Sequence, residues 1–296
     1  MYRYGFNTQE KVDEIKGPGN HYTAEFWEYD PRVVQRWNLD PKPNPSFSSY
    51  AIMQGSPIWY NDPLGDTVKV SYKGSDLTYN DGNLLNRDGT NYGGKGIGKD
   101  GRYKGFLGQT LNAIENISKG AEGKNLIDEL VNSENTFTIK RGSKNIFSAN
   151  STFKAGANIS EVQEATGNLS GSTGSGGTIY WNPKSRESGF NTDGNRSRPA
   201  FIGLAHELFH GRDSNQGQLH FDNDYTNQIS GVIYHSKKSG LKKSEWRAVY
   251  YENVLRGQLN LHLRTHYGIK ENLPGVFSPD GPKLLNETGD PINYPN

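Results

Sequence analysis

The strongest constraint on this chain is the stretch His206-Glu207-Leu208-Phe209-His210, which lies inside an apolar run. Pro199 suits the start of a helix and Gly211 suits the position just after a helix end, so the run predicts a helix between them. Residues four apart share one face of a helix, and two neutral imidazoles there can bind one Zn²⁺ at about 2.0–2.1 Å. Glu207 stands beside the first imidazole and can take a proton from a water at the metal. The stretch therefore predicts a catalytic zinc site, and a buried helix whose histidines only form hydrogen bonds is the alternative.

A zinc site of this kind needs a third protein ligand, and three acidic residues downstream are candidates. Glu245 stands three residues before an Ala on a helix predicted over 244–256. This arrangement resembles the glutamate-ligand zincins, and the resemblance favours Glu245. Glu252 lies about 10.5 Å further along the helix axis at 1.5 Å per residue, so the two glutamates cannot both bind one ion. Glu252 is then the alternative ligand or a partner that holds a ligand histidine. Asp213 resembles an aspartate ligand, and each of the three acids could also be a solvated surface charge.

The charge balance excludes some classes of partner. The 33 Lys and Arg residues match 32 Asp and Glu residues, which favours neither a nucleic acid nor a membrane surface as partner. No apolar run approaches the roughly 18 residues of a membrane span, and the first residues lack the apolar core of a signal peptide. We therefore expect a protein with no membrane span and no signal peptide of its own, which a dedicated export system would carry out of the cell. The chain has no cysteine, so disulfides do not stabilise it.

The chain divides by composition into four stretches. Residues 1–66 combine aromatic runs with Asp-Pro turns and predict short β elements. Residues 67–104 are rich in Gly, Asn and Asp and predict a linker. Residues 105–270 carry the periodic patterns, and residues 271–296 form a Pro/Gly-rich tail that predicts coil. Within 105–270 the spacing of apolar residues predicts the following elements: helices at 106–117 and 125–131, strands at 136–140 and 178–182, and an amphipathic helix at 254–267.

One strand stands shortly before the metal helix and is a candidate for substrate binding. It consists of Thr178, Ile179, Tyr180 and Trp181, and a proline follows soon after it. In zincins a strand in this place often forms the upper edge of the cleft, where an extended peptide can pair with it. We therefore expect these four residues to form a substrate edge.

Four motifs in residues 1–66 occur in a characteristic order. They are Tyr-Arg-Tyr-Gly-Phe-Asn at 2–7, Glu-Tyr-Asp-Pro-Arg at 28–32, Arg-Trp-Asn-Leu-Asp-Pro at 36–41 and Asn-Asp-Pro-Leu-Gly-Asp at 61–66. Together they resemble the core-associated C-terminal segment of Rhs (YD-repeat) proteins. In that family a large β-shell encloses a variable C-terminal toxin, and an Asp-Pro segment marks the boundary between the two. The resemblance implies that Asp62 and Pro63 form a processing-like boundary.

The motifs after residue 105 point to a second family. They are Gly-x-x-Leu-Ile-Asp-x-Leu at 123–130, Thr-Ile-Tyr-Trp-Asn-Pro at 178–183, His-Glu-Leu-Phe-His-Gly-x-Asp at 206–213, and Glu-Trp-Arg-Ala at 245–248 with Glu-Asn-Val-Leu-Arg at 252–256. Over about 105–268 they resemble the effector-type zinc metallopeptidases of bacteria, which are toxins delivered into other cells to cleave host proteins. The resemblance implies that His206, Glu207 and His210 form the catalytic core, with a protein of a target cell as substrate.

These observations predict an α+β fold, with a zincin-like metallopeptidase domain behind a small β-rich aromatic segment. The predicted function is a zinc-dependent endopeptidase that forms the tip of an Rhs-type polymorphic toxin and has a cognate immunity protein. Zn²⁺ would be held by His206, His210 and Glu245, with Glu207 as general base. Three tyrosines are candidates to stabilise the oxyanion: Tyr250, Tyr251 and Tyr267. The alternatives are a toxin tip that acts on nucleic acid with a structural zinc, and an inactive remnant.

Overall fold

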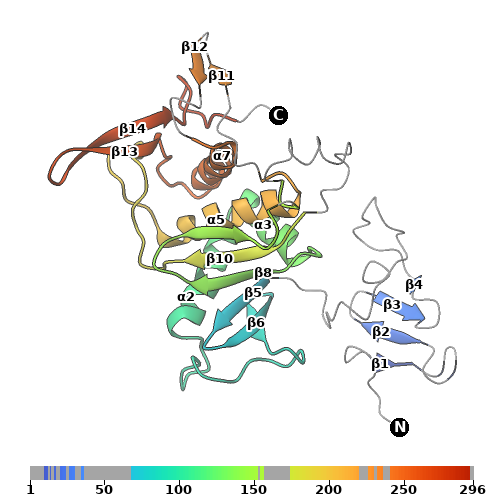
Figure 1. Ribbon diagram of the computed structural model, residues 1–296. Helices are drawn as coiled ribbons and strands as arrows, with labels where there is room; N and C mark the ends of the chain where they lie inside the picture. Colours follow the sequence, from blue (N-terminus) through green and yellow to red (C-terminus); the bar gives the residue numbers. More distant parts are fainter. Residues whose placement is uncertain are drawn as a thin grey trace. The chain divides into compact units, whose positions relative to one another are not determined.

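The computed structural model describes residues 68–152, 154–156, 174–219 and 241–293, the strands 226–229 and 232–235, and short stretches between residues 10 and 36. The chain separates into two units, one made of 1–66 with 85–92 and one made of 67–84 with 93–296. Figure 1 shows the elements of both, coloured along the sequence. Each unit is described by itself.

The first unit contains a small antiparallel sheet. Its strands are β1 (Glu10–Lys11), β2 (Tyr22–Ala24), β3 (Trp27–Asp30) and β4 (Gln35–Arg36), and each pairs with the next. The expectation of short β elements in this aromatic stretch therefore agrees with the structure between residues 10 and 36. Asp62 and Pro63 lie outside the described residues.

The second unit is built on a mixed six-stranded sheet with the order β7-β6-β5-β8-β10-β9. The strands are β5 (Val68–Tyr72), β6 (Ser75–Asn80), β7 (Asn83–Leu85), β8 (Phe137–Arg141), β9 (Ile146–Ala149) and β10 (Gly177–Trp181). β5, β8 and β10 run parallel to one another, whereas β6 and β9 are antiparallel to their neighbours β5 and β10. Both predicted strands near 136–140 and 178–182 are confirmed as β8 and β10.

The helices of this unit either contact the sheet or pack on helices that do, and the helix that carries the His-Glu-x-x-His motif contacts it (Figure 1). They are α2 (Gly105–Ser118), α3 (Ala121–Val131), α5 (Ala200–Asn215) and α7 (Lys243–Gln258). α5 contacts β9 and β10 on one side and α7 on another. The buried core between helices and sheet includes Phe106, Ile114, Ile139, Ile179 and Leu208. None of the helices in the described ranges is long and apolar enough to cross a membrane.

The predicted linker over 67–104 is wrong in its first half, because β5, β6 and β7 supply half of the sheet. Val68, Val70 and Leu77 are buried. The Gly-rich character comes from tight turns: Lys73-Gly74 has φ of 49° and 87°, and Asp81-Gly82 has φ of 40° and 80°. Two successive positive φ angles are typical of the two-residue turns that join antiparallel strands. A composition typical of a linker is here the composition of two hairpin turns.

The predicted coil over 271–296 and the predicted helix over 254–267 are also wrong. α7 ends at Gln258, and Asn260 follows with a φ of 55° that a helix does not accept. The chain then forms a hairpin of β13 (His266–Leu273) and β14 (Val276–Lys283) around a turn at Gly275. A second hairpin consists of β11 (Thr226–Ile229) and β12 (Val232–His235). Gly and Pro again mark turns between strands.

Candidate metal centre

α5 presents the two histidines of the motif on one face. The rings of His206 and His210 lie 4.9 Å apart between centroids and are nearly perpendicular. The helix does not end at Gly211 as expected but continues to Asn215, so both histidines lie well inside it. Leu204, Ala205 and Leu208 are fully buried. Packing on several sides therefore fixes the direction in which the two imidazoles point.

α7 brings Glu245 to the same place. One carboxylate oxygen of Glu245 lies 3.2 Å from His206 Nε2 and the other lies 3.5 Å from His210 Nε2. Two imidazole nitrogens and a carboxylate oxygen within 4.8 Å of one another form a group that could hold a metal ion. Ligand atoms on a tetrahedral zinc with bonds of about 2.0–2.1 Å stand about 3.3 Å apart. The donor types and their spacing therefore fit zinc.

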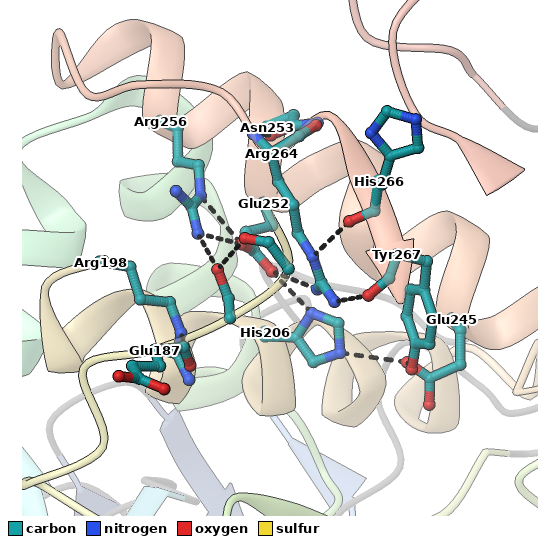
Figure 2. Close-up of polar contacts among 12 residues, drawn as sticks. Glu187, Arg198, His206, Glu245, Glu252, Asn253, Arg256, Arg264, His266 and Tyr267 are labelled. Atoms are coloured by element: carbon teal, nitrogen blue, oxygen red, sulfur yellow. Dashed lines mark hydrogen bonds and ion pairs between the residues drawn. The ribbon is translucent and has the colours of Figure 1, made fainter. Parts of the chain in front are cut away.

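Glu252 contacts His206 on the side of the ring that faces away from Glu245. Its carboxylate oxygen is 2.9 Å from His206 Nδ1, the ring nitrogen on the other side from Glu245 (Figure 2). A proton on Nδ1, donated to Glu252, leaves Nε2 as the bare nitrogen that a metal requires. Glu252 therefore fixes both the orientation and the tautomer of the histidine. It does not belong to the group of possible ligands formed by His206, His210 and Glu245.

Two arginines hold Glu252 in turn. Arg256 Nε donates to its carboxylate at 2.8 Å, and Arg264 Nη1 lies 3.8 Å from it. The side chains of Glu252 and Arg256 are only 3 % and 1 % exposed, so this is a buried ion pair. Arg256 also donates to the carbonyl of His262, and Arg264 donates to the carbonyl of Tyr267. The guanidinium groups thereby connect α7 to the chain that follows it, as Figure 2 shows.

The electrostatics of the centre favour positive charge between the two carboxylates. Burial lowers the pKa of His206, but hydrogen bonds to Glu245 and Glu252 outweigh it and raise the pKa to about 10. Burial raises the pKa of Glu245, but the neighbouring histidines lower it far more. Burial likewise raises the pKa of Glu252, and Arg256 and His206 more than offset it, so the pKa is well below its usual value. Both glutamates are therefore carboxylates, and a cation held by His206, His210 and Glu245 would supply the positive charge that they favour.

Asp213 has a different environment from the three grouped residues. Its carboxylate accepts hydrogen bonds from Arg247 Nε at 3.0 Å and Arg247 Nη2 at 3.1 Å. Burial raises the pKa of Asp213, and the pairing with Arg247 opposes this rise. Arg247 stands two residues after Glu245, so the ion pair ties the first turn of α7 to the end of α5.

The three candidate tyrosines differ in their contacts. The hydroxyl of Tyr267 donates to a Glu245 carboxylate oxygen at 2.9 Å, and burial and the charge of Glu245 raise the pKa of Tyr267. The ring of Tyr251 stacks on Phe209 and lies 3.9 Å from the guanidinium of Arg212. Tyr250 contacts Tyr251 edge to face. Only Tyr267 among the three has a described hydrogen bond to a residue of the centre.

Glu207 is buried at 8 % exposure, directly after the first histidine. Within the described ranges, no side-chain hydrogen bond involves its carboxylate. Its carboxylate is therefore available to accept a proton.

The expected substrate edge is wrong in its position. Thr178, Ile179, Tyr180 and Trp181 lie in β10, which pairs with β8 on one side and with β9 on the other. Both sets of backbone hydrogen-bonding groups are therefore used, and a peptide cannot add to this strand. β9 stands at the end of the sheet order, next to α5.

Sequence reasoning missed the arginines that support the centre. The spacing of Glu252 and Arg256, four residues apart on a predicted helix, was a signal for their ion pair. Arg247 and Arg264 have no such signal, because their partners are distant in sequence.

Comparison with known proteins adds one match. The model of the family Peptidase_M91, described as an effector protein, matches residues 95–267. Comparisons with curated proteins and with solved structures gave no match. The matched range contains α2, α3, α5 and α7 together with all three residues of the possible metal site. It does not include residues 1–66, so the resemblance of that segment to Rhs proteins stays a prediction.

Proposed function

Because this chain belongs to peptidase family M91, a family of effector proteins, we propose that it is a zinc-dependent endopeptidase that cleaves a protein inside a target cell. The observation that carries the proposal is the convergence of His206, His210 and Glu245 from α5 and α7, with the spacing that zinc ligands require. A zinc ion held by two imidazoles and one carboxylate would keep a coordination position open for water or substrate.

The metal, when bound, supplies Lewis-acid chemistry: it polarises a carbonyl and lowers the pKa of a water. Glu207 acts as general base and accepts a proton at its carboxylate, which its freedom from other described hydrogen bonds permits. The same group then returns the proton to the leaving amine. Glu252 keeps the proton of His206 on Nδ1 and the ring in place. We assign the oxyanion contact to Tyr267, because its hydroxyl already lies beside Glu245.

We propose that residues 1–66 are the end of an Rhs-type carrier, supported by the four motifs in their characteristic order and by the described β strands. Asp62-Pro63 would then mark the end of the carrier. The peptidase domain would begin near residue 67, since β5 belongs to its sheet. A toxin of this kind requires a cognate immunity protein in the cell that makes it.

The test uses the whole chain and its Glu207→Gln variant. Cell lysate or casein, plasmid DNA and RNA are each incubated with both proteins, with and without a chelator. We expect protein cleavage by the wild type alone and its loss with the chelator, accompanied by about one zinc per chain in metal analysis. New N-termini found by mass spectrometry in cells that express wild type but not Glu207→Gln would identify the substrate. Nucleic-acid cleavage without protein cleavage would overturn the proposal.

A further inference from the structure

Arg198 lies beside α5, the helix of the two histidines, and has no role in the proposed mechanism. It stands two residues before α5, and its guanidinium lies against Gly203 in the first turns of that helix. A Cβ at residue 203 would collide with Arg198 Nη1 and Nη2. Gly203 is four residues before Glu207, so both share one face of α5. Because Gly203 has no side chain, the guanidinium of Arg198 fits against the face of α5 that carries Glu207.

The guanidinium is fixed at one end and unsatisfied at the other. Arg198 Nε donates to the carbonyl of Glu187 at 3.1 Å, and Figure 2 shows the two residues together. Nη1 is buried and has no hydrogen-bond partner in the described part of the chain. None of the ion pairs among the described residues includes Arg198. Arg198 as a whole is only partly buried, but a buried Nη1 without an acceptor costs stability, so this arrangement does not serve stability.

A second donor lies at the same place. The amide nitrogen of Asn145 would also collide with a Cβ at Gly203, so it lies next to the guanidinium. The amide oxygen of Asn145 accepts the backbone N–H of Asn182 at 2.9 Å, which fixes the direction of the amide and leaves its nitrogen as a donor. Asn145 directly precedes β9, the strand at the end of the sheet order. Donors from two separate segments therefore converge beside Gly203.

The charges around Arg198 connect it to the catalytic centre. Burial lowers the pKa of Arg198, and Glu252 and Glu207 are the carboxylates whose charges oppose this effect. Arg256 and Arg264 already surround Glu252, which leaves Arg198 as a cation that an incoming anion can pair with. The pairing of guanidinium and carboxylate is among the strongest hydrogen-bonded contacts in proteins.

We propose that Arg198 and Asn145 form a specificity site that binds an acidic side chain of the protein substrate near the cleaved bond. This inference rests on the proposed function. Both donors lie beside Gly203, which is about 6 Å along the axis of α5 from Glu207, so an acidic side chain bound there would be close to the cleaved bond. The free carboxylate at the end of a substrate chain offers the same chemistry, and the experiment separates the two sources.

The experiment uses a library of peptides made by digesting a cell lysate, cleaved by the full chain and identified by mass spectrometry. We expect Asp or Glu to be enriched at one position relative to the cleaved bond. One cleaved peptide is then synthesised with Glu or Gln at that position, and each form with a free or an amidated C-terminus. For wild type, Glu→Gln should reduce kcat/KM about 10- to 100-fold, the value of a hydrogen bond to a charged group. Amidation should have little effect, and a large effect of amidation alone would overturn the side-chain assignment.

Variants at position 198 complete the test. In Arg198→Met the Glu and Gln peptides should be cleaved equally, and Arg198→Lys should restore part of the difference. Arg196→Met is the matched control, because Arg196 pairs with Glu187 and lies over Phe277 instead; it should keep the full preference for Glu. Arg198→Met should unfold at the wild-type temperature or above, since it removes a partly buried charge that has no ion-pair partner among the described residues. A large loss of stability would indicate a structural role and overturn the inference.

The two levels of failure are distinguishable. Cleavage of library peptides without an acidic preference, or a preference that Arg198→Met leaves unchanged, overturns the specificity site alone. Absence of any chelator-sensitive cleavage of peptides or proteins overturns the proposed function itself, and the specificity site with it.

Discussion

Replacing Glu252 by Gln tests whether the centre depends on a buried charge that does not touch the metal. The substitution keeps the shape of the side chain and removes its negative charge. Arg256, 2.7 Å from Glu252 and 1 % exposed, then loses the partner that neutralises it, and Arg264 at 3.8 Å loses part of its compensation. The hydrogen bond to His206 Nδ1 changes at the same time, because an amide can present a donor where the carboxylate only accepts.

The expected magnitude follows from burial. Removing one partner of a buried ion pair costs about 3–5 kcal/mol, because the other charge remains buried without compensation. For a domain of about 150–250 residues, 1 kcal/mol corresponds to roughly 2–4 °C in the unfolding midpoint, so Glu252→Gln should unfold roughly 6–20 °C earlier than wild type. Loss of a partner that orients a metal-binding histidine typically costs about 10- to 100-fold in metal affinity.

Thermal unfolding of the chelated proteins and zinc titration against a competing chelator measure the two effects separately. Glu245→Gln is the control, since Glu245 is 26 % exposed and contacts the histidines directly. It should lose more zinc affinity than Glu252→Gln and less stability. If Glu252→Gln unfolds at the same temperature as wild type and binds zinc as tightly, the buried ion pairs of Glu252 do not support the metal site.

Four further outcomes are expected. Glu207→Gln should keep its zinc and lose about 10²–10⁴-fold in cleavage rate, as metal analysis and a peptide assay would show; a wild-type rate would reassign the base. Arg247→Ala should lower both thermal stability and zinc affinity, because Asp213 is left buried and unpaired and the first turn of α7 loosens. Asp213→Asn should have the same two effects. If Asp213→Asn loses zinc while Glu245→Gln keeps it, Asp213 is the ligand. Gly203→Ala should displace the Arg198 guanidinium and therefore reduce the preference for Glu over Gln peptides, measured by their kcat/KM ratio. Zinc at 100 times its Kd should stabilise the chain by about 2.7 kcal/mol, so a chelator should lower the unfolding midpoint; no change would exclude specific binding to the folded state.

The metal motif could be predicted because it is a local pattern: His206 and His210 share a helical face by their spacing alone. Glu245 was favoured because its surroundings resemble those of the glutamate-ligand zincins. The distinction between Glu245 and Glu252 could not be made from spacing, since it depends on which side of His206 each one approaches. The sequence does not show which ring nitrogen of His206 faces which glutamate, and the structure does: Nδ1 faces Glu252 and Nε2 faces Glu245.

Tight turns explain most of the errors in predicting the fold from the sequence. Lys73-Gly74, Asp81-Gly82 and Pro274-Gly275 are the residues of a flexible linker and equally those of a tight hairpin, so composition does not separate the two. The error at β10 has another origin, because the pairing that covers it comes from β9, a four-residue strand with little periodicity. Arg198 could not be recognised either, because its buried Nη1 lacks an acceptor among the described residues only through the way that distant segments pack around it.

The arrangement of the ligands on α5 and α7 has a consequence for the chain as a polymer. His210 and Glu245 are 245 − 210 = 35 positions apart, so an ion held by both closes a loop of that length. Unlike a disulfide, the ion leaves when its ligands separate on unfolding, so it does not restrict the unfolded chain. It closes the loop only in the folded chain, which it stabilises by its binding free energy. In a chain without a single cysteine, the ion is then a reversible crosslink as well as a reagent. The supply of metal therefore influences how long the folded chain survives, in addition to whether it can cut a peptide bond.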